Sequence, residues 1–275
     1  MGAAPRPAVR AILFDAGNTL LRMDYAAIVT ALAARGVRAT ADAVQRAEWR
    51  ARVRLDAELF APAAPRSTES AASADRYVSL MLEELGVIDG ALARAIAEWR
   101  RAYNPPVGVW GRADPAAGAA LALTRGAGLA AGVVSNSNGA IRRILDGLGL
   151  ARHLDFVLDS SEVGVEKPDP RIFRLALERA GVGPAEAVYV GDLYSVDVLG
   201  ARAAGLSAVL LDPGACWGAR DCPVARTVLD AVKLILGPAS GGLTPHAERE
   251  AGGAQPRVED AGRGGAGWGR GSGDP

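Results

Sequence analysis

The chain has 275 residues, and its 31 Lys and Arg residues are balanced by 31 Asp and Glu residues. This zero net charge gives no reason to expect nucleic acid or an anionic membrane surface as a partner. Hydrophobic residues make up 49% of the chain, which is long enough to bury a sizeable core. No run of about 18 apolar residues occurs without a charge, so we expect no membrane span.

Five short apolar runs predict buried β-strands, at residues 9–14, 129–134, 156–158, 187–190 and 208–211. A polar or Gly-rich turn follows each run, and helical patterns lie between them. Strands that are apolar on both faces and alternate with helices indicate a parallel sheet covered on both sides. We therefore predict an α/β, doubly wound parallel-sheet (Rossmann-like) fold. A helix near residues 195–204, ended by Gly205, joins the last two predicted strands.

A long insertion separates the first predicted strand from the second. Its apolar residues recur at helical spacing in four segments, residues 26–35, 41–58, 75–85 and 91–103. A Pro- and Ser-containing stretch at residues 61–70 interrupts this pattern. We predict a helical subdomain of residues 23–106 inserted into an α/β core of residues 1–22 and 107–236.

The last segment, residues 237–275, differs in composition from the rest. Twelve of its 39 residues are Gly, and only three are large apolar residues. Such a segment cannot bury enough surface to offset its chain entropy, so we expect it to be disordered.

The cysteines and histidines favour neither a disulfide scaffold nor a zinc site. Cys216 and Cys222 lie in a single loop-like stretch, far in sequence from both His153 and His246. The N-terminus also lacks an apolar run of signal-peptide length. We expect two free thiols and a cytoplasmic protein.

Residues able to carry chemistry gather where the predicted strands end. The carboxyl edge of a doubly wound sheet is where ligands bind, so these side chains should converge there. They are Asp15, Asn18 and Thr19 after the first strand, Ser135 and Asn136 after the second, Lys167, and Asp192 and Asp197 after the fourth.

Three carboxylates held close together repel one another unless a cation joins them. Carboxylate oxygens of this kind suit Mg²⁺, which often binds one or two carboxylates together with a phosphate oxygen. Lys167, Ser135 and backbone amides would then meet an anionic ligand. Asp15 could act as a nucleophile on phosphorus and form an aspartyl-phosphate.

The order of these residues resembles the haloacid dehalogenase superfamily over residues 9–236, and the inserted helices resemble that family's cap domain. The stretch FDAGNTL is similar to its first motif, with Asp15 as nucleophile and Thr19 at the fifth position. The resemblance implies that Thr19, Ser135 and Asn136 bind the substrate, with Ser135 on its phosphoryl group. It further implies that Lys167 is a catalytic residue that offsets negative charge. It also implies that Asp15, Asp192, Asp197 and the backbone oxygen of Gly17 hold Mg²⁺.

Lysine usage strengthens the match at the third motif. Only two of the 31 basic residues are lysines, Lys167 and Lys233, and all the others are arginines. One of these two lysines stands where the family pattern requires one, which chance placement would seldom produce.

Gly17 departs from the family pattern. Phosphatases of this family carry an acid–base Asp at this position, and Gly cannot move a proton, so we expect reduced turnover. One interpretation is a Mg²⁺-dependent phosphatase of a small phosphorylated metabolite, in which Asp24 or a cap residue supplies the proton. The alternatives are a phosphate- or partner-binding protein without turnover, and a dehalogenase-like hydrolase. The dehalogenase branch typically lacks the first acid of the fourth motif, whereas Asp192 is present here. The pattern specifies neither the substrate nor the oligomeric state.

Overall fold

A computed structural model describes residues 8–61, 66–103 and 108–237. Its centre is a six-stranded sheet in the order β5-β4-β1-β6-β7-β8, in which each neighbouring pair is parallel. The strands are β1 (Ala11–Phe14), β4 (Ala130–Ser135), β5 (Phe156–Asp159), β6 (Ala187–Gly191), β7 (Ser207–Leu211) and β8 (Val224–Ala225). The predicted parallel α/β sheet is confirmed. Of the segment predicted to be disordered, residues 238–275 lie outside the described residues.

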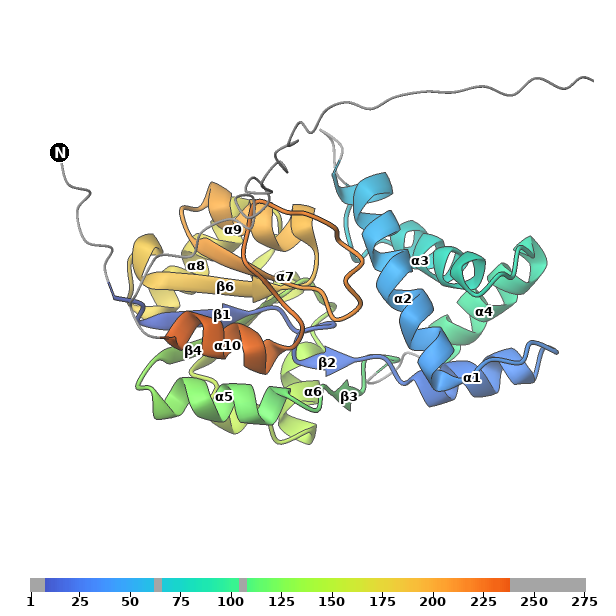
Figure 1. Ribbon diagram of the computed structural model, residues 1–275, viewed down its shortest axis with the longest axis horizontal. Helices are drawn as coiled ribbons and strands as arrows, with labels where there is room; N and C mark the ends of the chain where they lie inside the picture. Colours follow the sequence, from blue (N-terminus) through green and yellow to red (C-terminus); the bar gives the residue numbers. More distant parts are fainter. Residues whose placement is uncertain (1–7, 62–65, 104–107, 238–275) are drawn as a thin grey trace, which may run out of the picture.

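Helices cover both faces of the sheet (Figure 1). Ile12 and Phe14 of β1 pack in one apolar cluster, which also holds residues of α5 (Ala117–Gly126), α6 (Ile141–Gly147) and α10 (Val228–Leu236). Ala11 and Leu13 face the opposite cluster, which holds residues of α8 (Pro170–Ala180) and α9 (Leu199–Ala203). All four residues of β1 are fully buried. Burial on both faces explains why this strand is apolar throughout.

The remaining elements of the core are short. They are α7 (Ser160–Val163), the 3₁₀ turns η2 (Ala151–His153) and η3 (Pro184–Glu186), and the π-helical turn η4 (Tyr194–Val198), which leads into α9. The helix predicted near residues 195–204 is therefore a π turn followed by an α-helix. Gly205 follows α9 with a φ of +89°, a left-handed conformation that Gly adopts without steric cost.

Four α-helices lie beside the sheet, at the right of Figure 1, and share their own apolar cluster. They are α1 (Tyr25–Ala33), α2 (Ala41–Leu55), α3 (Ala71–Glu84) and α4 (Gly90–Tyr103), with the π turn η1 (Asp56–Phe60) directly after α2. Side chains of Asp24, Thr40 and Ser70 accept backbone N–H groups at the starts of α1, α2 and α3. Each of these three helices therefore begins at a polar capping residue.

The chain enters and leaves these helices through a two-stranded antiparallel ribbon of β2 (Leu21–Arg22) and β3 (Arg112–Ala113). Neither strand was predicted, and nor was β8, because two residues are too few to show an alternating pattern. The predicted domain limits at residues 22/23 and 106/107 stay a prediction, and residues 104–107 lie outside the described part. No helix of the described residues is long and apolar enough to span a membrane.

The order of the strands in the sheet determines where the candidate site lies. β1 is flanked by β4 on one side and by β6 on the other, and the chain builds outward in opposite directions from this point. Open α/β sheets bind ligands at such a switch point, outside the carboxyl ends of the strands. Asp15, Ser135 and Asp192 stand at the carboxyl ends of these three central strands.

Candidate active site

Asp15 lies directly after β1 and is 7% exposed. Its backbone N–H donates to the carbonyl of Val190 on β6 at 2.8 Å, which continues the sheet by one residue. Its carboxylate oxygen Oδ1 accepts a hydrogen bond from Lys167 Nζ at 2.5 Å. The same ammonium donates to Asp197 Oδ1 at 2.8 Å. Lys167 thus joins the acid after β1 to the acid in the turn after β6.

The ammonium of Lys167 is held in place by a third partner. It donates to the hydroxyl of Tyr189 at 2.9 Å, and that hydroxyl donates to the carbonyl of Val134 at 2.9 Å. Burial alone would lower the pKa of Lys167, but Asp15 and Asp197 outweigh that effect and raise the pKa well above its usual value. Lys167 is therefore a positively charged anchor and not a proton carrier at neutral pH.

The turn after β6 brings Asp192 and Asp197 next to Asp15. Oδ2 of Asp197 accepts the backbone N–H groups of Asp192 and Leu193, both at 3.0 Å. A Cβ at Gly191 would lie 2.5 Å from this carboxylate, so a side chain there would displace it. Gly200 is similarly constrained, because a Cβ there would lie 2.9 Å from the backbone of Pro168. These glycines allow the close packing of the turn and α9 against Asp197 and Pro168.

Asp15, Asp192 and Asp197 each have a carboxylate oxygen within 4.8 Å of the other two. Among the residues that the structure describes, these three acids form a group that could hold a metal ion. Oxygen ligands of this kind, buried and negatively charged, match the preference of Mg²⁺. Burial raises the pKa of Asp15 to about 6, against the opposing charge of Lys167. Burial likewise raises the pKa of Asp192 to about 8, against the charge of Arg52.

Helix α2 contributes two charged residues that sequence reasoning missed. Arg52 Nη1 donates to Asp192 Oδ2 at 2.9 Å, and Arg52 Nε lies 3.2 Å from Glu48 Oε1. Glu48 also accepts from Asn18 Nδ2 at 3.0 Å and from the hydroxyl of Tyr77 at 2.5 Å. The inserted helices are therefore tied by ion pairs and hydrogen bonds to the acid cluster.

The charges of the buried side chains around Asp15 favour a bound cation at this site. Ion pairs connect a buried set of four carboxylates and two cations, namely Asp15, Asp192, Asp197, Glu48, Lys167 and Arg52. When all six are ionised, two negative charges remain uncompensated in a buried environment, which is costly. A bound divalent cation would balance them, so the residues present fit Mg²⁺.

Ser135 is the last residue of β4 and Asn136 follows it, and their side chains make different contacts. Ser135 lines the cavity beside Asp15, and its hydroxyl donates to the carbonyl of Asn136 at 3.3 Å. The side chain of Asn136 accepts the backbone N–H of Lys167 at 2.8 Å and donates to the carbonyl of Lys167 at 2.9 Å. It donates as well to Thr68 at 2.8 Å. These contacts hold the backbone of Lys167 in place. Asn136 also lines the cavity, and its role in substrate binding stays a prediction.

Of the other residues considered in the sequence, Gly17 lies at the cavity, whereas Thr19 and Asp24 do not line it. Gly17 lines the same cavity as Asp15, whereas Thr19 is 1% exposed and lines a separate hollow. Asp24 caps α1 and pairs with Arg112 at 2.7 Å. Although partial burial opposes it, hydrogen bonds from the backbone of Ala27 and from Arg112 lower the pKa of Asp24. Asp24 is therefore poorly suited to donate a proton.

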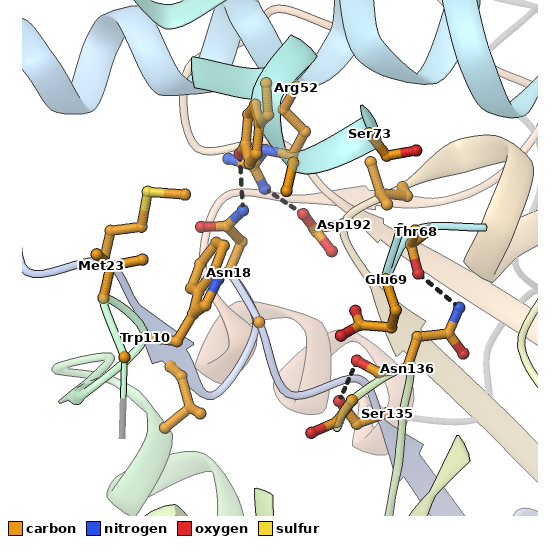
Figure 2. A pocket seen from close by; sticks show the side chains of 18 of the residues that line it. Asn18, Met23, Arg52, Thr68, Glu69, Ser73, Trp110, Ser135, Asn136 and Asp192 are labelled. Atoms are coloured by element: carbon orange, nitrogen blue, oxygen red, sulfur yellow. Dashed lines mark hydrogen bonds and ion pairs between the residues drawn. The ribbon is translucent and has the colours of Figure 1, made fainter. Parts of the chain in front are cut away.

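A cavity of about 390 Å³ opens between the carboxyl edge of the sheet and the inserted helices. Figure 2 shows Asp192 and Ser135 on its wall, together with Glu69, which points into it from the inserted helical region. Trp110 and Met23 lie on the opposite side in this view. The acids thus lie on one side of the cavity, and the large apolar side chains of Trp110 and Met23 lie on the other, beside Asn18.

A family model described as haloacid dehalogenase-like hydrolase matches residues 9–205. The chain belongs to this family. The match includes Asp15, Ser135, Lys167, Asp192 and Asp197, the residues that the structure brings to one sheet edge.

Two curated relatives illustrate the similarity. Over 84 residues the chain is 54% identical to the mouse haloacid dehalogenase-like hydrolase domain-containing protein 3, a stretch that covers 30% of this chain and 34% of that protein. Over 101 residues it is 50% identical to a phosphoserine phosphatase of Thermus thermophilus, covering 36% of this chain and 41% of the relative. The matched stretches thus span less than half of either relative.

A solved structure of the same family shows the same fold. The HAD-hydrolase YfnB from Bacillus subtilis, described as bound to magnesium, superimposes with a TM-score of 0.56 at 20% identity. This superposition covers 84% of this chain and 99% of YfnB. The shared fold therefore extends over most of this chain.

Proposed function

We propose that this protein is a Mg²⁺-dependent phosphatase that acts on a small phosphorylated metabolite through an aspartyl-phosphate on Asp15. The observation that carries the proposal is the contact of Lys167 Nζ with Asp15 at 2.5 Å and with Asp197 at 2.8 Å, beside Ser135 on the cavity wall. Such a site combines an oxygen nucleophile, a fixed positive charge and a hydroxyl for the transferred group. The similarity to a phosphoserine phosphatase supports phosphate chemistry.

The reaction has two steps. An oxygen of Asp15 attacks phosphorus, and the bond from phosphorus to the leaving oxygen breaks with its electron pair going to that oxygen. Water then attacks phosphorus, which releases phosphate and restores the Asp15 carboxylate. Lys167 and Ser135 hold the phosphoryl oxygens during both steps. Bound Mg²⁺, held by Asp15, Asp192, Asp197 and the backbone of Gly17, would neutralise the charge of the phosphoryl group.

The acid cluster is the reason to prefer phosphate over halide chemistry. Asp192 and Asp197 are both present and both lie with Asp15 in one buried group. Attack of a carboxylate on a carbon–halogen bond involves no phosphoryl group. That reaction therefore needs no cation to balance phosphoryl charge. Asp197 also pairs with Lys167, so the preference depends on Asp192, a further buried carboxylate whose burial is unfavourable and which halide chemistry does not require.

Phosphate release from an activated aryl phosphate tests this function. The wild-type protein should release phosphate only with Mg²⁺, and Asp15→Asn should lower kcat/KM by at least about 10³-fold because the nucleophile is lost. The comparison also separates an enzyme from a binding protein. Equal release by both proteins, or none from either, would overturn the proposal.

A further inference from the structure

Residues 67–69 hold one end of the inserted helical region against the core beside Lys167. The hydroxyl of Ser67 lies 2.8 Å from one carboxylate oxygen of Glu166 and 3.0 Å from the other, and Glu166 immediately precedes Lys167. Thr68 accepts the hydrogen bond from Asn136. Ser67 thus contacts the residue before Lys167. Thr68 contacts Asn136, whose side chain holds the backbone of Lys167.

The next residue, Glu69, lines the cavity, and Figure 2 shows its carboxylate pointing into it. Four carboxylates line the described part of this cavity, and three of them are Asp15, Asp192 and Asp197. Glu69 is the fourth, and it lies outside the group that could hold a metal. It is therefore the carboxyl group that remains available for proton transfer.

Tyr77, another residue of the inserted helices with a proton to donate, is less suitable than Glu69. Tyr77 lines the cavity, but its hydroxyl already donates to Glu48 at 2.5 Å. Burial and the charge of Glu48 raise the pKa of Tyr77 well above its usual value. A tyrosine in this state does not give up its proton readily at neutral pH.

The direction of the reaction also favours Glu69. The attacking and leaving oxygens lie roughly in line across phosphorus, so the leaving group points away from Asp15. Asp15 stands at the sheet edge, and residues of the inserted helices line the same cavity. Figure 1 shows these helices beside the sheet. Glu69 is carried by that region and points into the cavity, where a leaving group directed away from Asp15 would lie.

We propose that Glu69 is the catalytic acid of this enzyme and takes over the proton transfer that Gly17 cannot perform. The inference rests on the proposed function. In the first step, the leaving oxygen takes the proton of the Glu69 carboxyl group as its bond to phosphorus breaks. In the second step, the Glu69 carboxylate takes a proton from the water that attacks phosphorus, which restores the acid. The overall change is hydrolysis of one phosphate ester bond by one water.

The surroundings of Glu69 suit this role. Although its side chain is exposed to solvent, nearby protein atoms and the charges of Glu166, Asp159 and Asp15 raise its pKa to about 7, against the opposing charge of Lys167. A group with a pKa near the working pH can both give and accept a proton efficiently. Because the first step needs the protonated form, the rate with a poor leaving group should fall as the pH rises through about 7.

The test compares two leaving groups in wild type and Glu69→Gln. A nitrophenyl phosphate has a leaving group that needs little protonation, whereas a simple alkyl phosphate needs a full proton. We expect Glu69→Gln to lower kcat/KM for the alkyl phosphate by about 10²-fold or more and for the nitrophenyl phosphate by less than about tenfold. Glu69→Gln should also abolish the fall in the alkyl phosphate rate near pH 7, and Glu69→Asp should restore part of the rate.

The matched control is Glu98→Gln, which removes the same charge from an exposed position on α4. It should change neither rate nor pH profile. If hydrolysis depends on Asp15 but Glu69→Gln affects both substrates equally or not at all, Glu69 is not the acid and the proposed function stands. If no hydrolysis depends on Asp15, the proposed function fails and the assignment of Glu69 fails with it.

Discussion

Gly17 is the residue at which this chain leaves the family pattern, and the structure shows room for a side chain there. The nearest atoms to a Cβ built at Gly17 belong to the ring of Trp110, at 3.9 Å, which is an ordinary van der Waals contact. The backbone of Gly17 is not in the left-handed region either. Neither packing at Cβ nor backbone strain requires Gly at this position. The absence of an acid at this position is therefore not imposed by packing or by the backbone.

Restoring the acid at this residue should increase turnover. We expect Gly17→Asp to raise kcat/KM for alkyl phosphates about tenfold or more, because an acid near the leaving oxygen is typically worth about 10²–10⁴ in rate. In this background Glu69→Gln should cost less than it does in wild type, because two acids can then serve the same step. Steady-state rates of the two single variants and the double variant measure this coupling.

Gly17→Asn is the control for that experiment, because it adds similar bulk beside Trp110 without an acid. It should give no gain in rate. A gain of equal size from Gly17→Asn and Gly17→Asp would show that proton transfer is not the cause.

At the scale of single elements, helix α2 and the turn after it connect the inserted helices to the acid cluster. Glu48, Arg52 and Asp56 follow one another at four-residue spacing and so share one helix face. Arg52 pairs with Asp192, and Asp56 accepts the backbone N–H of Ser195 at 3.0 Å and its hydroxyl at 2.8 Å. Charged residues on a buried face mark a polar contact with another part of the molecule.

Loss of the contact between Asp56 and Ser195 should lower the free energy of unfolding. Asp56 is 3% exposed, so Asp56→Ala leaves two buried donors of Ser195 without their acceptor. We expect the free energy of unfolding to fall by about 1–3 kcal/mol, and by less in Asp56→Asn, which keeps an acceptor oxygen. Urea unfolding measures both.

Arg46→Ala, at an exposed position of α2, is the reference for this prediction. It should change the free energy of unfolding by no more than about 0.5 kcal/mol. A loss in Asp56→Ala no larger than that in Arg46→Ala would contradict a stabilising role for the contact.

Across the whole molecule, the sequence predicted the sheet well because its central strands are apolar on both faces. It also predicted which acids meet, since Asp15 and Asp192 each follow such a strand. It could not predict the partner of Asp192, because Arg52 lies 140 residues away on an inserted helix. The position of Glu69 depends likewise on how that region packs against Asn136 and Glu166. Local patterns carry no information about such contacts, which arise only when the helices meet the core.

The central claim for the whole molecule is that Asp15 carries the phosphoryl group during turnover. Mixing the protein with Mg²⁺ and an activated aryl phosphate, quenching in acid after short intervals and measuring the intact mass and its peptides tests it most directly. We predict one added phosphoryl group, located on Asp15, which appears before steady state and is absent from Asp15→Asn. Rapid phosphate release with no phosphoryl group on Asp15 at any interval would contradict the account.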